Sequence, residues 1–256
     1  MFNNNTVQIM TYGLLSDKVK NRVAVAQLSD LHEKVFGQEN DRLFEKVEEI
    51  EPDIIAVTGD MVAHGNQKSV DERYTMQFAR ALARIAPTYF VTGNHERNFG
   101  GCVENIMSEA GVSVLRGGDF KTLRVGESIV NISGMDDISF DDADVNMAVS
   151  VFDKRRGFNI FLAHRPEYYQ MYLNRNIDLV LTGHTHAGQI RFPKIGAFAM
   201  SGQGFMPKYV EGEFTDGSTT MIISRGLGSS GYPKIRINNP PELVAVYIEP
   251  DNINEI

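Results

Sequence analysis

Side chains able to bind metal ions are concentrated in five short motifs of this chain. Five of the six histidines lie in these glycine- or acid-flanked stretches. In chain order the motifs are Asp30-Leu31-His32, Gly59-Asp60, Gly93-Asn94-His95-Glu96, Ala163-His164 and Gly183-His184-Thr185-His186. Carboxylate, amide and imidazole donors without sulfur favour Mn, Fe, Zn, Co or Ni over calcium or a cysteine-bound zinc. The residue types therefore predict a site for transition-metal ions.

The candidate ligands are too numerous for a single four-coordinate ion. They comprise two aspartates, one asparagine and four histidines: Asp30, His32, Asp60, Asn94, His164, His184 and His186. Such a set suits two ions bridged by a carboxylate. Each motif alone is weak evidence, because a lone Gly-Asp or Asp-x-His is usually a turn or a polar pair. Five motifs together make coincidence a poor explanation. His64, shortly after Asp60, is predicted to be a loop histidine on the rim.

Several of these motifs directly follow a run of β-forming residues. The runs cover residues 23–28, 54–57, 89–91, 160–162 and 179–181. Polar side chains at strand ends predict a cluster on the edge of a sheet. An extended backbone would turn Asp30 and His32 to the same side, and His184 and His186 repeat this spacing. The glycines before Asp60 and Asn94 fit tight turns.

Amphipathic helices are predicted between these strands. Residues 40–50 place Leu43 and Val47 on one helical face, and the helix over 70–85 ends before Pro87. Further helices are predicted over 145–152 and from Pro166, with short strands in 113–133 and strands at 189–192, 219–224 and 243–248. Apolar strands separated by amphipathic helices indicate an α/β fold with helix-covered sheets. Residues 1–256 are predicted to form a single domain with a core of about 22–249.

Composition narrows the classes of partner. The net charge of −8 argues against nucleic acid as the main partner, although a metal cluster can supply local positive charge. Cys102 is the only cysteine, so no intramolecular disulfide can form. Residues 1–20 lack the pattern of a signal peptide, and no window has the roughly 20 apolar residues of a membrane helix. We therefore expect a cytoplasmic protein without an integral membrane segment.

Two late loops allow two interpretations each. The glycines of 225–231 would let backbone N–H groups approach a phosphate, or they form plain turns between strands. The loop 196–209 contains five large apolar residues: Phe198, Met200, Phe205, Met206 and Tyr209. These side chains line an acyl or nucleoside pocket, or they fill the core beneath the loop.

The motifs, in this order, resemble those of the calcineurin-like metallophosphoesterase superfamily, from about Val23 to Ile248. Residues 183–189, 208–210 and 224–228 are similar to a narrower branch of bacterial phosphodiesterases and UDP-2,3-diacylglucosamine pyrophosphatases. The resemblance implies a four-layer α-β-β-α sandwich of two mixed sheets flanked by helices. It also implies two divalent ions, with manganese favoured, and a bridging hydroxide that attacks phosphorus.

The resemblance assigns a role to each motif residue. Asp30, His32 and His186 would hold the first ion, Asn94, His164 and His184 the second, and Asp60 would bridge them. His95 matches the histidine that is not a ligand. It would stabilise the transition state or protonate the leaving oxygen.

One departure from the superfamily bears on the substrate. Members that act on phosphoproteins carry Gly-Asp-x-x-Asp-Arg, whereas this chain continues from Asp60 with Met61-Val62-Ala63-His64. Arg97, Arg165 and Arg225 are the candidates to bind phosphate instead. We therefore predict a hydrolase of phosphodiester or pyrophosphate bonds in a small molecule. A non-catalytic scaffold that binds a partner and a nuclease are the alternatives, and the oligomeric state is open.

Overall fold

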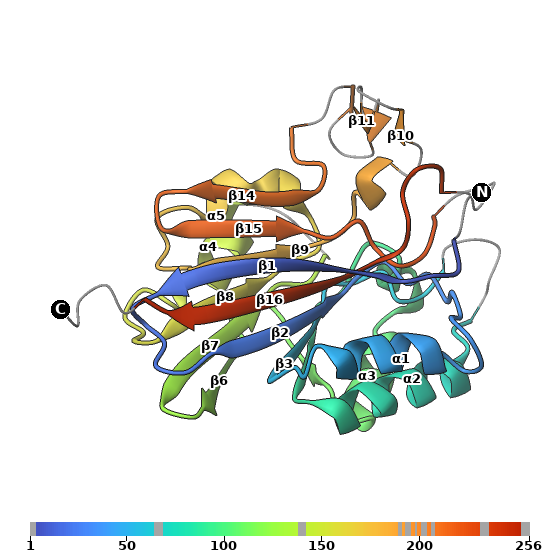
Figure 1. Ribbon diagram of the computed structural model, residues 1–256, viewed down its shortest axis with the longest axis horizontal. Helices are drawn as coiled ribbons and strands as arrows, with labels where there is room; N and C mark the ends of the chain where they lie inside the picture. Colours follow the sequence, from blue (N-terminus) through green and yellow to red (C-terminus); the bar gives the residue numbers. More distant parts are fainter. Residues whose placement is uncertain are drawn as a thin grey trace.

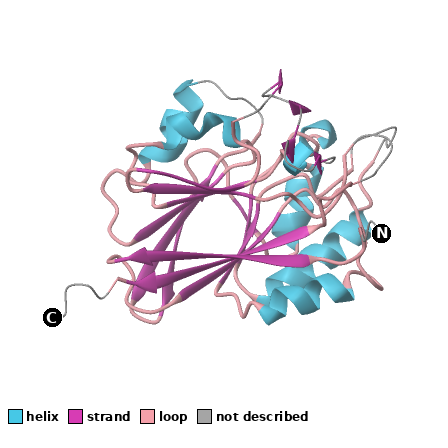
Figure 2. Cartoon of the chain, turned by 45° about the horizontal axis from the view of Figure 1, so that its top comes forward, coloured by secondary structure: helices cyan, strands magenta, loops and turns pink. Residues whose placement is uncertain are grey.

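Two six-stranded mixed sheets face each other, and helices cover the outer face of each (Figure 2). This arrangement is seen in a computed structural model, which describes residues 4–63, 69–137, 142–188, 191–192, 196–197, 199–200, 204–205, 208–230 and 236–251. The predicted four-layer α-β-β-α sandwich is confirmed.

The first sheet carries the three earliest motifs. Its order is β1 (Gln8–Ser16), β16 (Glu242–Pro250), β2 (Val23–Leu28), β3 (Ile54–Val57), β4 (Thr88–Phe90) and β5 (Ser113–Val114). Strands β2 to β5 are parallel, and β16 runs antiparallel to β2. The carboxyl ends of β2, β3 and β4 therefore lie at one edge of the sheet, where the chain enters each motif.

The second sheet carries the two later motifs. Its order is β14 (Gly212–Asp216), β15 (Thr219–Ile223), β9 (Leu179–Thr182), β8 (Phe158–Leu162), β7 (Ser128–Gly134) and β6 (Phe120–Val125). Strands β15, β9, β8 and β7 are parallel. Two short antiparallel pairs follow the last motif: β10 (Arg191–Phe192) with β11 (Gly196–Ala197), and β12 (Ala199–Met200) with β13 (Gly204–Phe205).

Three layers of buried apolar side chains hold the sandwich together: one lies between the two sheets, and one lies between each sheet and its helices. The helices α1 (Asp41–Glu49), α2 (Glu72–Ile85) and α3 (Cys102–Glu109) pack on the first sheet (Figure 1). The second sheet packs against α4 (Asp142–Ser150) and α5 (Tyr169–Tyr172). Because strand side chains alternate, β2 sends Val23 and Val25 between the sheets and Ala26 and Leu28 toward the helices. Within the described residues, no helix is long and apolar enough to cross a bilayer.

Candidate metal centre

The five motifs meet where the two sheets come together. Asp30, Asp60 and His95 follow strands of the first sheet, whereas His164 and His184 follow strands of the second. Hydrogen bonds join the two halves: the His184 backbone N–H donates to Asp30 Oδ2 at 3.0 Å. Beneath them, Gln27 Nε2 donates to the Thr182 carbonyl at 2.8 Å. The site is therefore built by both sheets.

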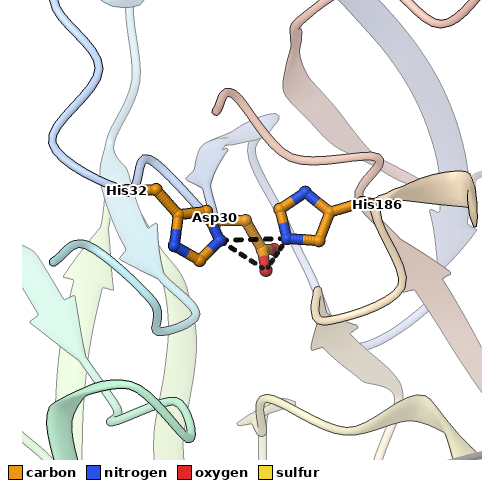
Figure 3. Close-up of side chains that lie close together, drawn as sticks. All are labelled: Asp30, His32 and His186. Atoms are coloured by element: carbon orange, nitrogen blue, oxygen red, sulfur yellow. Dashed lines mark hydrogen bonds and ion pairs between the residues drawn. The ribbon is translucent and has the colours of Figure 1, made fainter. Parts of the chain in front are cut away.

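Asp30, His32 and His186 form a first ligand group (Figure 3). Asp30 Oδ1 lies 3.3 Å from His186 Nε2 and 4.0 Å from His32 Nε2, and the two ring nitrogens are 3.0 Å apart. Asp30 Oδ2 accepts from Ser29 Oγ at 2.6 Å, whereas the buried Oδ1 accepts no hydrogen bond. A buried acceptor without a donor is costly. A cation between the three groups would satisfy it.

Asp60, His164 and His184 form a second group. Asp60 Oδ2 is 3.4 Å from His164 Nε2, which is 3.2 Å from His184 Nδ1. His164 Nδ1 donates to the Thr58 carbonyl at 2.7 Å, so its Nε2 is left to face Asp60. Asp60 Oδ2 also lies 3.9 Å from His32 Nε2. Asp60 thus stands between the two groups, where a shared ligand would have to be.

His95 joins the cluster from the first sheet, and Asn94 directly precedes it in the chain. The Asn94 Oδ1 atom is buried and accepts no hydrogen bond, as expected of an oxygen that faces a cation. His95 Nε2 lies 3.7 Å from Asp60 Oδ2, and the His95 and His32 rings are 4.5 Å apart between centroids. The His95 backbone N–H donates to Asp60 Oδ1 at 2.9 Å. His95 is therefore a neighbour of the Asp60 carboxylate.

Protonation states also fit metal binding. Burial lowers the pKa of His32 and of His184 to about 3 and holds that of His186 well below its usual range, so these rings are neutral. Burial raises the pKa of Asp30 to about 6. Metals bind neutral imidazole and ionised carboxylate, and a bound cation favours both forms.

Asp60 and His164 form a buried ion pair in the metal-free chain. Burial opposes charge on both groups, but the facing carboxylate raises the pKa of His164 to about 10. The histidine charges in turn hold the pKa of Asp60 below its usual range, against the effect of burial. His164 must release this proton when a metal ion takes its Nε2.

The extended geometry expected for Asp30–His32 and His184–His186 is wrong. The strands end at Leu28 and Thr182, and the ligands lie in left-handed turns beyond them. Five of the seven candidate ligands have positive φ: Asp30 (53°), His32 (49°), Asp60 (56°), His184 (69°) and His186 (47°). Such positions cost roughly 1–3 kcal/mol each and cluster at functional sites. Backbone bonds such as Asp30 N–H to the Gly59 carbonyl, 2.9 Å, hold the turns.

Two glycines allow the turns to touch. A Cβ on Gly59, at φ +87°, would lie 2.8 Å from His164 Nδ1 and 2.7 Å from Gly93 Cα. A Cβ on Gly183 would lie 2.9 Å from Ser29 Cβ. Neither space admits a side chain, so glycine is required at both positions.

Glu96 is a site residue whose role the sequence did not reveal. Its carboxylate is fully buried and accepts four backbone N–H groups. Oε2 accepts from Asp60 at 2.9 Å and Gly93 at 2.7 Å, and Oε1 accepts from Met61 at 2.8 Å and Val62 at 3.2 Å. Glu96 thereby clamps the turn of Asp60 to the turn of Asn94. The only signal in the sequence is an acid directly after His95.

The three candidate arginines differ in their surroundings. Arg165 forms a two-pronged ion pair with the fully buried Asp137, including Nη2 to Oδ2 at 3.0 Å. Arg225 is buried and pairs with Glu242, with Glu211 at 3.7 Å. Arg97 is exposed, two residues beyond His95, and within the described part of the chain it has no ion pair. Arg97 is thus the one of the three whose guanidinium is not engaged by a carboxylate.

The described residues of the two late loops bear on both pairs of interpretations. In 225–231, Leu227 N–H donates to the Ser29 carbonyl at 3.0 Å and Gly228 N–H to the Asp30 carbonyl at 2.6 Å, so these amides brace the first motif. Tyr209 is buried against Tyr169 and Phe214, as core filler would be. His64, Phe198 and Met206, and the side chains of Met200 and Phe205, lie outside the described residues.

The amino-acid sequence is similar to those of known metallophosphoesterases. A family model described as calcineurin-like phosphoesterase matches residues 23–188. The Bacillus subtilis (strain 168) protein described as an uncharacterized metallophosphoesterase, YkuE, is 28% identical over 233 residues, which is 89% of this chain and 79% of YkuE. An uncharacterized metallophosphoesterase of Aquifex aeolicus (strain VF5) is 29% identical over 244 residues, 89% of this chain and 85% of that protein.

Solved structures share the fold. A dimetal phosphatase from Danio rerio aligns with a TM-score of 0.53 at 12% identity, covering 80% of this chain and 88% of that one. A putative 5'-nucleotidase from Staphylococcus aureus aligns with a TM-score of 0.56 at 15% identity. That alignment covers 88% of this chain but 54% of the nucleotidase, so the chain spans about half the length of that protein.

Proposed function

The chain belongs to the calcineurin-like phosphoesterase family of metal-dependent phosphoester hydrolases, and we propose that it cleaves phosphodiester or pyrophosphate bonds in a small molecule at a centre of two divalent ions. The observation that carries the two-ion proposal is the position of Asp60. Its Oδ2 lies 3.4 Å from His164 Nε2 in the second group and 3.9 Å from His32 Nε2 in the first.

In this proposal the ligands divide as the two groups do. Asp30, His32 and His186 hold the first ion, Asn94, His164 and His184 hold the second, and Asp60 is shared. Nitrogen and oxygen donors of this kind suit Mn, Fe, Zn, Co or Ni, and manganese is the first to test. When bound, the ions lower the pKa of a water molecule and offset the negative charge of the phosphate.

His95 is the proposed catalytic residue. This proposal is supported by the 3.7 Å distance from His95 Nε2 to Asp60 Oδ2 and by the hydrogen bond from the His95 backbone N–H to Asp60 Oδ1, which holds the residue there. An N–H of this ring would donate to a phosphate oxygen or protonate the leaving oxygen. Arg97 is the arginine we favour for the substrate, because Arg165 and Arg225 are held by buried carboxylates.

The turn after Asp60 supports a substrate other than a phosphoprotein. Ala63 stands where that motif has its second acid; it is 5% exposed and carries no charge. The acid and the arginine of Gly-Asp-x-x-Asp-Arg have no counterparts here. The net charge of −8 disfavours nucleic acid, since binding a phosphate backbone needs a basic surface.

The test compares bis-p-nitrophenyl phosphate with p-nitrophenyl phosphate on chelator-stripped protein refilled with Mn²⁺, Fe²⁺, Zn²⁺, Co²⁺ or Ni²⁺. We expect metal-dependent cleavage with the diester preferred. Asp60→Asn should abolish it, whereas His95→Ala should keep both ions and lower kcat by about 10²–10⁴-fold. Asp178→Asn, at a partly buried aspartate just before β9, is the matched control and should stay active.

Four outcomes would count against the proposal. Activity that survives metal removal, or an Asp60→Asn protein as active as wild type, would exclude a metal-dependent mechanism at this site. Preference for the monoester would redirect the substrate search. Two bound ions without turnover of any phosphoester would favour a binding scaffold.

A further inference from the structure

Arg236 is the largest fully buried side chain among the described residues, with 1% of its surface exposed. Among the described residues, its guanidinium donates only to neutral oxygens. Nε donates to the Asn239 carbonyl at 2.8 Å, Nη2 to the Arg225 carbonyl at 2.6 Å and to Asn239 Oδ1 at 3.1 Å, and Nη1 to the Gly228 carbonyl. Burial lowers the pKa of Arg236 to about 10, so it remains charged near neutral pH. Burying a cation costs free energy of folding unless hydrogen bonds compensate for its lost hydration.

These bonds lead to the first ligand group by two routes. Asn239 Nδ2 donates to the His186 carbonyl at 2.6 Å. Gly228, whose carbonyl accepts from Arg236, donates its own N–H to the Asp30 carbonyl at 2.6 Å. Arg236 and Asn239, here called the strap, therefore hold the backbone of two of the three ligands in the first group.

The backbone held by the strap is strained. Asp30 and His186 have φ values of 53° and 47°, which non-glycine residues adopt only when surrounding contacts enforce them. The packing is also close: a Cβ on Gly226 would lie 2.7 Å from Asp30 Cβ. Without the strap, each ligand would lose one of the contacts that hold its backbone in this conformation.

We propose that Arg236 and Asn239 are positioning residues that set the metal affinity of the first group. The inference rests on the proposed function, because it requires that Asp30, His32 and His186 hold an ion. Substituting a residue that orients metal ligands through hydrogen bonds typically lowers metal affinity by about 10–100-fold. Both strap residues lie beyond residues 23–188, the part of the chain that the family model matches.

The test measures metal binding directly, by titrating chelator-stripped protein with Mn²⁺ and counting bound ions. Wild type should bind two ions. Asn239→Asp should fold, because it keeps the volume of the side chain and its contact with Arg236. It loses only the donor to the His186 carbonyl. We expect it to bind one ion normally and the other about 10–100-fold more weakly. Arg236→Met should do the same.

Asn159→Leu is the matched control. Asn159 is fully buried at the amino end of β8, and its Nδ2 donates to the Asn176 carbonyl at 2.6 Å, the same kind of bond that Asn239 makes. Loss of this bond should lower stability and leave both metal affinities unchanged. If Asn159→Leu also binds one ion more weakly, general destabilisation would explain the reduced metal affinity of the strap variants.

Double variants assign the weakened ion. In a His32→Ala background, where the first group is already broken, Asn239→Asp should change nothing further. In a His184→Ala background it should weaken the one remaining ion. Equal weakening of both ions, or wild-type binding in both Asn239→Asp and Arg236→Met, would overturn the inference.

The same titration separates this inference from the proposed function. A wild-type protein that binds two ions but hydrolyses no phosphoester contradicts the proposed function alone. A wild-type protein that hydrolyses phosphodiesters while the strap variants bind both ions normally contradicts the strap alone. A wild-type protein that binds no ion contradicts both.

Discussion

At the scale of single residues, Glu96 organises the centre without facing it. One buried carboxylate accepts N–H groups from Asp60 and Gly93 through Oε2 and from Met61 and Val62 through Oε1. The turns after β3 and β4 are thereby tied to one side chain. Burial, with the nearby charge of Asp60, raises the pKa of Glu96 to about 7. The hydrogen bonds to the carboxylate therefore form against the cost of removing its charge from water.

Glu96→Gln should therefore weaken both fold and metal binding. The amide keeps one accepting oxygen but turns an NH₂ group toward a pair of backbone N–H donors. Each buried donor left unpaired costs about 1–3 kcal/mol. We expect unfolding in urea to show a loss of about 2 kcal/mol or more, with metal affinity lowered by about 10–100-fold. Glu104→Gln, at a buried glutamate on α3, should leave metal affinity intact. Wild-type affinity in Glu96→Gln would refute the clamp.

Asp136, just beyond β7, gives a pH prediction away from the ligands. Burial raises its pKa to about 6, although Thr92 Oγ1 donates to Oδ1 at 3.2 Å. Because the folded pKa exceeds the ordinary 3.8, the folded state favours the protonated form. Its stabilising effect is complete below pH 3.8 and is lost as pH rises through 6.

Asp136→Asn removes this dependence. Relative to the variant, the wild-type protein should lose about 2 kcal/mol of unfolding free energy between pH 4 and pH 7, slightly less than a rise of the pKa from 3.8 to about 6 implies, because the carboxyl is partly exposed to solvent. Urea denaturation of the metal-free proteins across this range measures the difference. Parallel pH profiles for the two proteins would show that the folded pKa of Asp136 is not raised.

Residue types and spacing were enough to predict which side chains gather, but not what supports them. The structure brings Asp30, His32, Asp60, His164, His184 and His186 together with His95, as the motifs indicated. Glu96 and Arg236 could not be assigned from the sequence, because their partners are backbone groups whose proximity exists only in the fold. The same holds for Arg165, whose partner Asp137 is 28 residues away.

At the scale of elements, buried parallel strands were the most predictable features. β2 and β3 match the expected runs 23–28 and 54–57, because a strand covered on both faces is continuously apolar. β1 was not predicted: it is an edge strand whose residues are all exposed or partly exposed, and its partner β16 lies at the other end of the chain. The helix α3 was also missed, since Gly100 and Gly101 precede it. The left-handed ligand turns run against local preference and are imposed by tertiary contacts.

The turn after β3 gives a prediction at this scale. Gly59 and Gly101 have nearly equal φ, +87° and +86°, but a Cβ would strike His164 and Gly93 at Gly59 and meet nothing within 4 Å at Gly101. Gly101→Ala should therefore cost about 1 kcal/mol, from backbone strain alone. Gly59→Ala should cost about 3 kcal/mol and also weaken the second ion, because His164 must move. Equal losses of stability and unchanged metal binding would contradict the close approach of these turns.

At the scale of the whole molecule, the proposed ions join the two halves of the sandwich. Asp30, His32 and Asp60 come from the first sheet, whereas His164, His184 and His186 come from the second. An ion held by both halves favours the folded chain, since the unfolded chain does not assemble the site.

Metal should consequently raise the melting temperature. At a concentration 100 times the Kd, binding adds about 2.7 kcal/mol per ion, equivalent to a rise of about 5–10 °C for a chain of this size. Differential scanning calorimetry with and without Mn²⁺ measures the shift, and His184→Ala should reduce it. A melting temperature that does not change at saturating Mn²⁺ would contradict a metal site shared by the two sheets.

The most direct test of the two-ion centre is anomalous diffraction from crystals of the manganese-loaded protein. We predict two peaks on either side of Asp60 Oδ2, about 3.5–4 Å apart. One should lie among Asp30, His32 and His186, and the other among Asn94, His164 and His184. A single peak, or peaks away from Asp60, would contradict the account.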